Sequence, residues 1–394
     1  MARAIEPCDP ESDLQQVVFY DQGIGSETFG WLEKKVRGMT GWGIGKNITD
    51  CYRFLAHNYE PGDEIYFIGF SRGAYTVRSL GGLLDTVGLL AKTDLEHLPD
   101  AYDFYRSSKN KRTGRHFATI RRLKTRTEKP EIAFVGVFDT VGALGIPTPG
   151  LSRLLQRRIS FHNTRLSNHV KHAYQALAID EQRAPFQPAF WTAKDAHSHV
   201  QQVWFAGVHS NIGGGYPDCA LSDISFGWMV QRAMECGLVF NERFISDLKE
   251  FNPDPVGRLD NSFSLGYKLL NKIRVMKPYE RPIGQHLGIG EMIHDSLLTR
   301  LQEVPGYRPA NLIESGADIQ ALLGEKGGHA ILNVCGVQMQ VSLKRQQVRK
   351  PKRVDATVTL EGEAERICEL IDLSEQGGGN SSSRPRRWPG CPEY

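Results

Sequence analysis

A serine, an aspartate and a histidine carry the strongest chemical signal in this sequence, because each one follows an apolar run. Ser71 is the central residue of the Gly-Phe-Ser-Arg-Gly segment 69–73, which comes directly after the apolar run 65–68. This pattern between a buried strand and a helix is typical of a nucleophile elbow, a sharp turn that exposes the serine hydroxyl. Gly69 and Gly73 would flank the turn because a Cβ at either position would collide with the strand or the helix.

A serine nucleophile needs a base to take its proton and an acid to orient that base. Asp139 comes directly after the apolar run 134–138, and His209 comes directly after the apolar run 203–208. Since the carboxyl ends of parallel strands meet at one edge of a sheet, we expect Ser71, Asp139 and His209 to converge there. Both later residues also have structural alternatives. Asp139 could cap the following turn, and a lone histidine at a strand end is more often structural than catalytic.

The elements that would position these residues alternate along the chain. Continuous apolar runs predict buried strands, and apolar residues at helical spacing predict helices. Such alternation predicts an α/β fold with a mostly parallel sheet and helices on both faces. The predicted strands cover about residues 16–21, 65–70, 132–138 and 203–208, and the predicted helices about residues 47–58, 72–89, 100–107, 166–177, 223–236 and 291–303.

The composition changes after about residue 310, which predicts three parts. Residues 1–310 are expected to form the α/β catalytic domain. Residues 311–373 are expected to form a small appended element, with short strands at 330–343 and 354–360. Residues 374–394 have the composition of a disordered tail.

Bulk properties argue against several classes of function. The net charge of +3 is too small to indicate a nucleic acid partner. No apolar stretch is long enough to span a bilayer, and the first residues lack the apolar segment of a signal peptide. The 7 cysteines include no Cys-x-x-Cys pair, which argues against a cysteine zinc site and for synthesis in the cytoplasm. We expect the chemistry to need neither a metal ion nor an organic cofactor.

A basic segment between residues 109 and 129 carries nine lysines and arginines mixed with apolar residues. Such a segment could contact anionic lipid headgroups at a membrane surface. A solvated helix face is the more frequent role of a basic run, so both interpretations stay open.

Beyond these signals, the sequence resembles a family of bacterial and fungal α/β-hydrolase domains that includes the phospholipase effectors of type VI secretion. The most specific matches are Gly-Phe-Ser-Arg-Gly-Ala-Tyr at 69–75 and Gly-Val-His-Ser-Asn-Ile-Gly-Gly-Gly-Tyr at 207–216. The other matching segments are residues 17–25, 138–142, 161–164, 169–181, 221–224 and 307–310. The resemblance covers about residues 1–312 and implies an α/β-hydrolase-like sheet.

The resemblance also implies an activity and its residues. It implies a serine esterase acting on lipid esters, with Ser71 as nucleophile, His209 as base and Asp139 as orienting acid. It further implies synthesis in the cytoplasm, export without a signal peptide, and contact with a secretion apparatus and a target membrane.

One departure from the family lies near the N-terminus. Family members usually begin with a further strand that ends in Asp-Gly-Thr, and this sequence has no such strand ahead of residues 16–21. A loop after an early strand normally supplies one of the N–H donors that stabilise the oxyanion. The backbone N–H of Arg72 is one candidate donor here, and the loop at Gln22 and Gly23 is the candidate for the second.

Two hypotheses from different classes follow from the sequence. The first is a serine hydrolase that cleaves carboxylic esters, most specifically a lipase or phospholipase with Ser71, His209 and Asp139 as a triad. The second is an N-terminally shortened, catalytically weak relative that works as a binding or interaction module.

Overall fold

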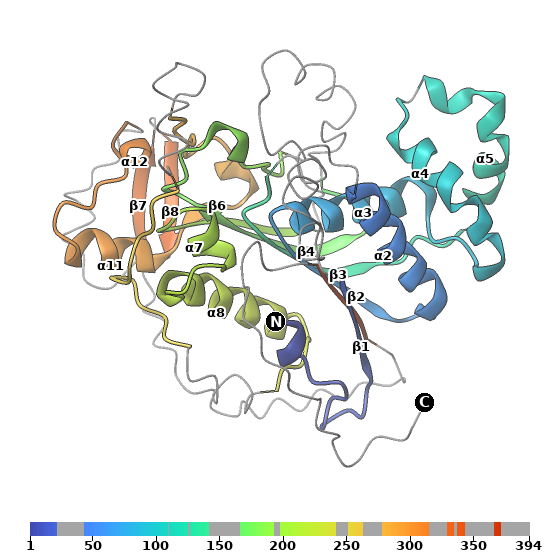
Figure 1. Ribbon diagram of the computed structural model, residues 1–394, viewed down its shortest axis with the longest axis horizontal. Helices are drawn as coiled ribbons and strands as arrows, with labels where there is room; N and C mark the ends of the chain where they lie inside the picture. Colours follow the sequence, from blue (N-terminus) through green and yellow to red (C-terminus); the bar gives the residue numbers. More distant parts are fainter. Residues whose placement is uncertain are drawn as a thin grey trace, which may run out of the picture.

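A single large sheet forms the centre of the computed structural model, which describes residues 1–21, 43–108, 110–124, 127–141, 166–192, 198–241, 251–262 and 278–314 and three later strands. The strands are β1 (Gln16–Asp21), β2 (Glu64–Phe70), β3 (Ile132–Phe138), β4 (Val170–Ala178), β5 (His199–Phe205), β6 (Glu291–Ile293), β7 (His329–Val334), β8 (Val337–Ser342) and β9 (Arg366–Ile371). They form one nine-stranded sheet in the order β1-β9-β2-β3-β4-β5-β6-β8-β7 (Figure 1). Every neighbouring pair is parallel except β7 and β8. The predicted α/β class with a mostly parallel sheet is therefore confirmed.

Helices cover both faces of this sheet (Figure 1). The helices are α2 (Ile44–Asn58), α3 (Arg72–Val87), α4 (Leu98–Arg106), α5 (Ala118–Lys124), α7 (His209–Gly213), α8 (Ala220–Glu235), α11 (Asp295–Glu303) and α12 (Ala310–Glu314). The helices predicted near 47–58, 72–89, 100–107 and 223–236 occur as α2, α3, α4 and α8. Within the described part of the chain, no helix has both the length and the apolar character to cross a membrane.

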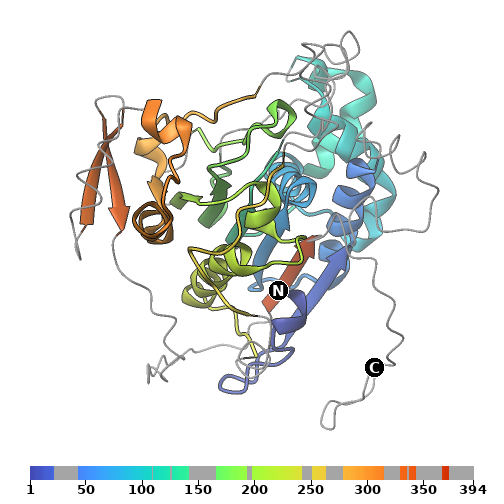
Figure 2. The ribbon, with the colours of Figure 1, turned by 60° about the vertical axis from the view of Figure 1, so that its left-hand side comes forward.

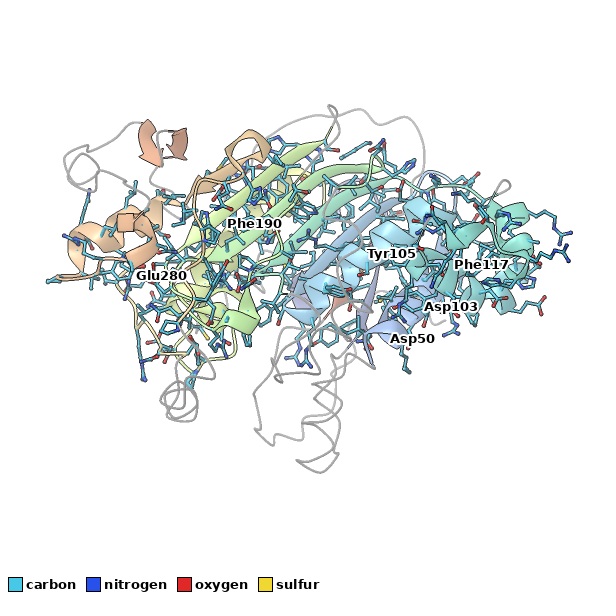
Figure 3. All side chains as sticks on the ribbon, turned by 90° about the horizontal axis from the view of Figure 1, so that it is seen from above. Asp50, Asp103, Tyr105, Phe117, Phe190 and Glu280 are labelled. Carbon is cyan, nitrogen blue, oxygen red and sulfur yellow. The ribbon has the colours of Figure 1, made fainter. Side chains whose placement is uncertain are left out.

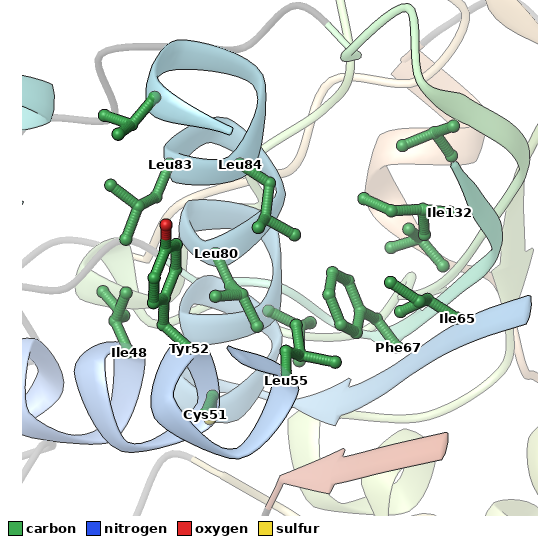
Figure 4. Close-up of a cluster of buried hydrophobic side chains, with 14 of the residues drawn as sticks. Ile48, Cys51, Tyr52, Leu55, Ile65, Phe67, Leu80, Leu83, Leu84 and Ile132 are labelled. Carbon is green, nitrogen blue, oxygen red and sulfur yellow. The ribbon is translucent and has the colours of Figure 1, made fainter. Parts of the chain in front are cut away.

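The elbow strand β2 packs against helices on both sides. Ile65 and Phe67 belong to a buried cluster with α2 and α3 (Figure 4), whereas Tyr66 and Ile68 belong to a second cluster with α8. Since successive side chains point to opposite faces of a strand, a strand buried on both faces has a continuous apolar sequence. Burying such large side chains stabilises the fold by roughly 2 kcal/mol each. The strand that leads to Ser71 is therefore a rigid support.

Strand β4 corrects a prediction made from residue spacing. The recurrence of Leu166, Val170, Ala173, Tyr174 and Leu177 predicted a helix, but residues 170–178 form a strand between β3 and β5. The last six residues of β4 are all buried. Because both faces of a central strand are covered, its apolar residues need not alternate, and their spacing can match a helix by coincidence.

The predicted helix 291–303 also begins differently. Residues 291–293 form the short strand β6 beside β5, and only residues 295–303 are helical as α11. The buried carboxylate of Glu291 accepts hydrogen bonds from the Trp204 indole N–H at 2.8 Å and from the Gly284 and His286 N–H groups at 2.8 and 2.6 Å. The Glu291 side chain thus connects β6 to neighbouring segments. These hydrogen bonds stabilise residues 291–293 as a strand and not as a first helical turn.

The segment beyond residue 310 contributes strands to the main sheet. The predicted strand region 330–343 is a hairpin of β7 and β8, and β8 pairs with β6 at one edge. Strand β9, which the sequence did not predict, lies between β1 and β2 and pairs in parallel with both (Figure 2, red beside blue). The sequence predicted a small appended element here, and the three described strands of this segment pair within the main sheet. The predicted strand 354–360 and tail 374–394 lie outside the described residues, and the division into domains stays a prediction.

Candidate active site

The turn between β2 and α3 presents Ser71 at the carboxyl edge of the sheet. Ser71 has φ 56° and ψ −115°, a backbone conformation that costs a residue with a side chain roughly 1–3 kcal/mol. A Cβ on Gly69 would lie 2.6 Å from the carbonyl carbon of Gly73, so the strand and the helix cross with no room for a side chain. The Ser71 N–H donates to the Phe138 carbonyl of β3 at 3.0 Å. The elbow expected at this sequence is therefore present and tied to the next strand.

Asp139 and His209 follow β3 and β5 at the same edge. Asp139 comes directly after β3 with φ 41°, and its N–H donates to the Ala176 carbonyl of β4 at 2.7 Å. His209 is the first residue of the short helix α7. Gly207 precedes it with φ 131°, a conformation that favours glycine and lets the chain turn from β5 into α7.

The three side chains form one chain of hydrogen bonds. Ser71 Oγ lies 2.8 Å from His209 Nε2, and His209 Nδ1 lies 2.6 Å from Asp139 Oδ2. Asp139 is fully buried and His209 is 3% exposed. The imidazole contacts two aromatic rings, with centroid distances of 4.6 Å to Phe70 and 4.8 Å to Phe186. The ring is therefore held in one plane with both nitrogens engaged.

A buried arginine that no sequence pattern indicates, Arg281, binds the Asp139 carboxylate through two hydrogen bonds. Arg281 Nη1 donates to Oδ1 at 2.6 Å, and Arg281 Nη2 donates to Oδ2 at 2.9 Å. Burial alone would raise the pKa of Asp139, but the Arg281 guanidinium and the hydrogen bond from His209 hold this pKa well below its ordinary value. Arg281 lies in an irregular segment without a motif or periodic pattern, so no sequence signal pointed to it.

The ionised state of Asp139 decides what the imidazole can do. An ionised carboxylate only accepts hydrogen bonds, so His209 Nδ1 must donate to Asp139 Oδ2. The opposite nitrogen, Nε2, then has a lone pair directed at Ser71 Oγ, and the serine hydroxyl donates to it. This arrangement can take the serine proton when the hydroxyl attacks an electrophile.

Two further carboxylates hold the backbone around His209. Asp180 Oδ2 accepts the Gly207 N–H at 2.7 Å, and Glu181 Oε2 accepts the His209 N–H at 3.2 Å. Glu181 is in turn bound by Arg183, whose Nε and Nη2 donate at 2.9 Å each. In the sequence, residues 169–181 are distinguished only by the family resemblance. The structure shows that the end of this segment fixes the start of α7.

The Asp180 carboxyl should make stability depend on pH. Burial raises the pKa of Asp180 from 3.8 to about 6, although hydrogen bonds from Tyr307 and Gly207 and the charge of Arg300 oppose the shift, while Glu181 adds to it. The pKa of Asp180 is higher in the folded than in the unfolded protein. The neutral acid therefore contributes its full stability below about pH 4, and this contribution is lost as the pH rises to about 6. The expected loss over this window is roughly 3 kcal/mol.

Asp180→Asn mimics the neutral acid and should flatten this part of the profile. Urea unfolding of the wild type and the variant at several pH values between 4 and 7 measures the effect. Equal slopes for the two proteins would contradict the assignment. Asp139 acts with the opposite sign, because its lowered pKa removes stability only as the pH falls below its ordinary value, outside the window compared here.

The remaining predicted site residues are partly described. Arg72 is the first residue of α3, where helix N–H groups lie at the positive end of the helix dipole. Gln22 and Gly23, the candidates for the second oxyanion donor, lie outside the described residues. Across the residues that the structure describes, no three or more histidines, cysteines or carboxylates gather as a metal site.

A family match covers the segments that build this site. Residues 1–232 match the family described as "T6SS, Phospholipase effector Tle1-like, catalytic domain", and this region is more than half of the chain. The chain belongs to this family. The resemblance inferred from the elbow and histidine segments is therefore confirmed. The Tle1-like match contains Ser71, Asp139 and His209 but ends before Arg281.

Individual proteins similar to this Tle1-like chain have sequence identities of 30% or less. "Uncharacterized protein YEL023C" of Saccharomyces cerevisiae is 30% identical over 197 residues, which are 45% of this chain and 28% of the yeast protein. An uncharacterized protein from Pseudomonas aeruginosa has 22% identity and a TM-score of 0.31 over 53% of this chain and 30% of its own. The Tle1 effector bound to the VgrG spike has 20% identity and a TM-score of 0.28, over 55% and 40% respectively. The chain thus spans less than half of each relative's length, and neither solved structure transfers a site or a partner to it.

Proposed function

We propose that this Tle1-like protein is a serine hydrolase that cleaves carboxylic esters of lipids, with phospholipids as the preferred class. The observation that carries the proposal is the chain of hydrogen bonds from Ser71 Oγ through His209 to Asp139, with contacts of 2.8 and 2.6 Å. Membership of a family of phospholipase effector catalytic domains supports the lipid substrate.

The proposed reaction has two half-reactions. Ser71 Oγ attacks the ester carbonyl carbon while its proton passes to His209 Nε2, and the carbonyl oxygen becomes an oxyanion. The C–O bond to the alcohol then breaks, and the leaving oxygen takes the proton from His209. Water repeats the sequence on the acyl-enzyme, which releases the fatty acid and restores the Ser71 hydroxyl. Asp139 stays ionised and stabilises the imidazolium each time it forms.

The oxyanion needs donors that point to where its charge develops. We assign the Arg72 N–H as one donor, because it follows the nucleophile at the start of α3. We assign the second donor to the loop at Gln22 and Gly23. A site with only one donor would turn over on the order of 100- to 1,000-fold more slowly. A loss of this size corresponds to the second hypothesis, a catalytically weak relative.

Active-site labelling with a fluorophosphonate probe tests the proposal directly. The probe should modify the wild type on the tryptic peptide 54–72, in which Ser71 is the only serine or threonine. The Ser71→Ala variant should stay unlabelled, and Ser107→Ala, an unrelated serine after α4, should label like the wild type. A folded wild type that does not label would instead favour the binding-module hypothesis.

Family membership motivates proposals about transport and partners. We propose that the protein is made in the cytoplasm, is exported without a signal peptide and contacts a component of a secretion apparatus on the way. Immunodetection in culture medium from an intact producer strain and from one without a working apparatus tests this. Equal amounts outside both strains would contradict the proposal.

The basic segment forms a lobe that we propose as a contact for anionic lipid. Residues 110–124, the basic lobe, hold six lysines and arginines and no acidic residue. They form two short 3₁₀ turns and α5 beside α4 (Figure 3), and Phe117, the last residue of the second turn, is buried. Arg112 donates to the Tyr105 carbonyl of α4, and Arg121 donates to the Arg112 carbonyl within the lobe. Lys111 and Arg115 are exposed. Exposed cations of this kind each contribute about 1 kcal/mol to binding a negative membrane surface.

Charge reversal should separate membrane binding from chemistry. Lys111→Glu with Arg115→Glu is expected to weaken binding to phosphatidylglycerol vesicles at least about tenfold, with turnover of a soluble ester unchanged. Vesicle sedimentation and a soluble-ester assay measure the two effects. Arg3→Glu with Arg258→Glu, an equal charge change at exposed sites elsewhere, is the control. Equal losses in both double variants would show that only net charge matters.

A further inference from the structure

We propose that Arg281 is a positioning residue for the proposed reaction, which fixes the Asp139 carboxylate and sets the pH above which the Ser71–His209 pair is active. This inference rests on the proposed function. It adds a residue from outside the family-matched region 1–232.

The hydrogen bonds of Arg281 hold its guanidinium in a single position. Besides the two bonds to Asp139, Nη1 donates to the Ala178 carbonyl at 2.9 Å and Nη2 donates to the Phe186 carbonyl at 2.6 Å. The side chain is 1% exposed. A planar guanidinium with two parallel bonds to one carboxylate fixes the orientation of that carboxylate as well as its charge. Asp139 therefore cannot rotate away from His209 without breaking the pair with Arg281.

The backbone that carries Arg281 is anchored on both sides. The Tyr279 N–H donates to the Gln182 carbonyl at 2.8 Å, and Asn311 Nδ2 donates to the Arg281 carbonyl at 3.2 Å. Ile283 is buried in the cluster formed with α11. The irregular segment around Arg281 is thus held by the segment that follows β4 and by α12, which gives the guanidinium a rigid support.

The guanidinium of Arg281 also binds Phe186, whose ring packs against His209. The Phe186 carbonyl accepts from Arg281, while the Phe186 ring packs edge-on against the His209 imidazole at 4.8 Å. The charged groups near Asp139 are His209 from α7, Arg281, and the Glu181–Arg183 pair after β4. Arg281 is the cation among them that donates to both carboxylate oxygens, including Oδ2, which also accepts from His209 Nδ1.

This placement predicts the direction of a pH effect. A cation bound to Asp139 lowers the carboxylate's ability to stabilise a proton on the imidazole. Removing the guanidinium charge should move the acid limb of the pH profile of kcat/KM upward, by about one pH unit or more. A merely structural arginine would change stability and leave this limb in place.

Two substitutions separate charge from geometry. Arg281→Gln removes the cation and should shift the acid limb of kcat/KM upward. Arg281→Lys keeps a charge without the two-pronged grip, so it should leave the limb within a few tenths of a unit and lower kcat about tenfold at unchanged KM. An unshifted limb in folded Arg281→Gln would overturn the proposal. If that variant does not fold, wild-type kcat in Arg281→Lys overturns it.

A buried arginine that does not touch Asp139 provides the matched control. Arg300 is 4% exposed and donates to the Pro255 and Gly257 carbonyls at 2.8 and 2.7 Å. Arg300→Gln should lose stability and keep the wild-type acid limb. A shift as large as that of Arg281→Gln would show that general loosening, and not the Asp139 contact, moves the limb.

An NMR titration keeps the inference independent of turnover. In the Ser71→Ala background, the imidazole signals of His209 should titrate with a higher midpoint when Arg281 is also replaced by glutamine. Equal midpoints would contradict the proposal whether or not the protein hydrolyses esters. Absence of labelling and hydrolysis in the wild type would instead contradict the proposed function alone.

Discussion

Replacing Ser71 with alanine is expected to lower kcat for ester hydrolysis by about 10⁶-fold, the scale seen when a nucleophile that acts together with its base is removed. Alanine keeps the backbone of the elbow, including the Ser71 N–H bond to Phe138, and removes only the Oγ that lies 2.8 Å from His209. The loss should therefore appear in kcat with little change in stability. A soluble chromogenic ester and circular dichroism measure the two quantities.

Glycine at the same position provides a useful comparison. Ser71→Gly removes the same hydroxyl and also relieves the φ of 56°, so it should be as inactive as Ser71→Ala but more stable by about 1 kcal/mol. Turnover within tenfold of the wild type in either variant would show that another group is the nucleophile.

Replacing Asp139 with asparagine is expected to be the second largest effect, with kcat lowered about 10⁴-fold. The two carboxylate oxygens accept from His209 Nδ1, from both terminal nitrogens of Arg281 and from the Ala178 N–H. Asparagine has one acceptor oxygen, so its amide N–H₂ must face donors and the imidazole loses its orientation. Arg281 would also keep a buried charge without its counter-ion, which should lower the free energy of unfolding by about 3–5 kcal/mol.

The combination of the two losses makes the asparagine variant informative. Steady-state kinetics and urea unfolding of the same preparation should show both. Arg281→Gln together with Asp139→Asn should recover part of the stability, because neither group is then left charged, and should recover none of the activity. An asparagine variant with wild-type stability would show that the Arg281 contact contributes little.

The sequence predicted the parts of the site that depend on local pattern. Ser71, Asp139 and His209 each follow a continuous apolar run, and a strand buried on both faces produces such a run wherever it occurs. Because parallel strands end at one edge, residues far apart in the chain could be predicted to meet there. The structure brings all three within hydrogen-bonding distance.

The features that the sequence did not predict depend on long-range contacts. Arg281 follows no strand or motif. Its place in the site is shown only by its contact with Asp139, 142 positions away in the sequence. Strand β4 has helical spacing because both of its faces are buried. Strand β9 has a place in the sheet only through its pairs with β1 and β2. A pattern within a short stretch of sequence does not show which distant residues will be partners. Arg281, the strand β4 and the strand β9 were therefore not predicted.

The place of β9 has a consequence for how the chain reaches its native state. Gln16 and Glu64 both pair with Arg366, so the strand next to the elbow comes from near the other end of the sequence. During synthesis, β2 would leave the ribosome with an open edge that stays unpaired until β9 arrives. Contacts of such large sequence separation slow folding, and an open apolar edge invites association with other chains. We therefore expect slow refolding and a need for chaperones while the chain is incomplete.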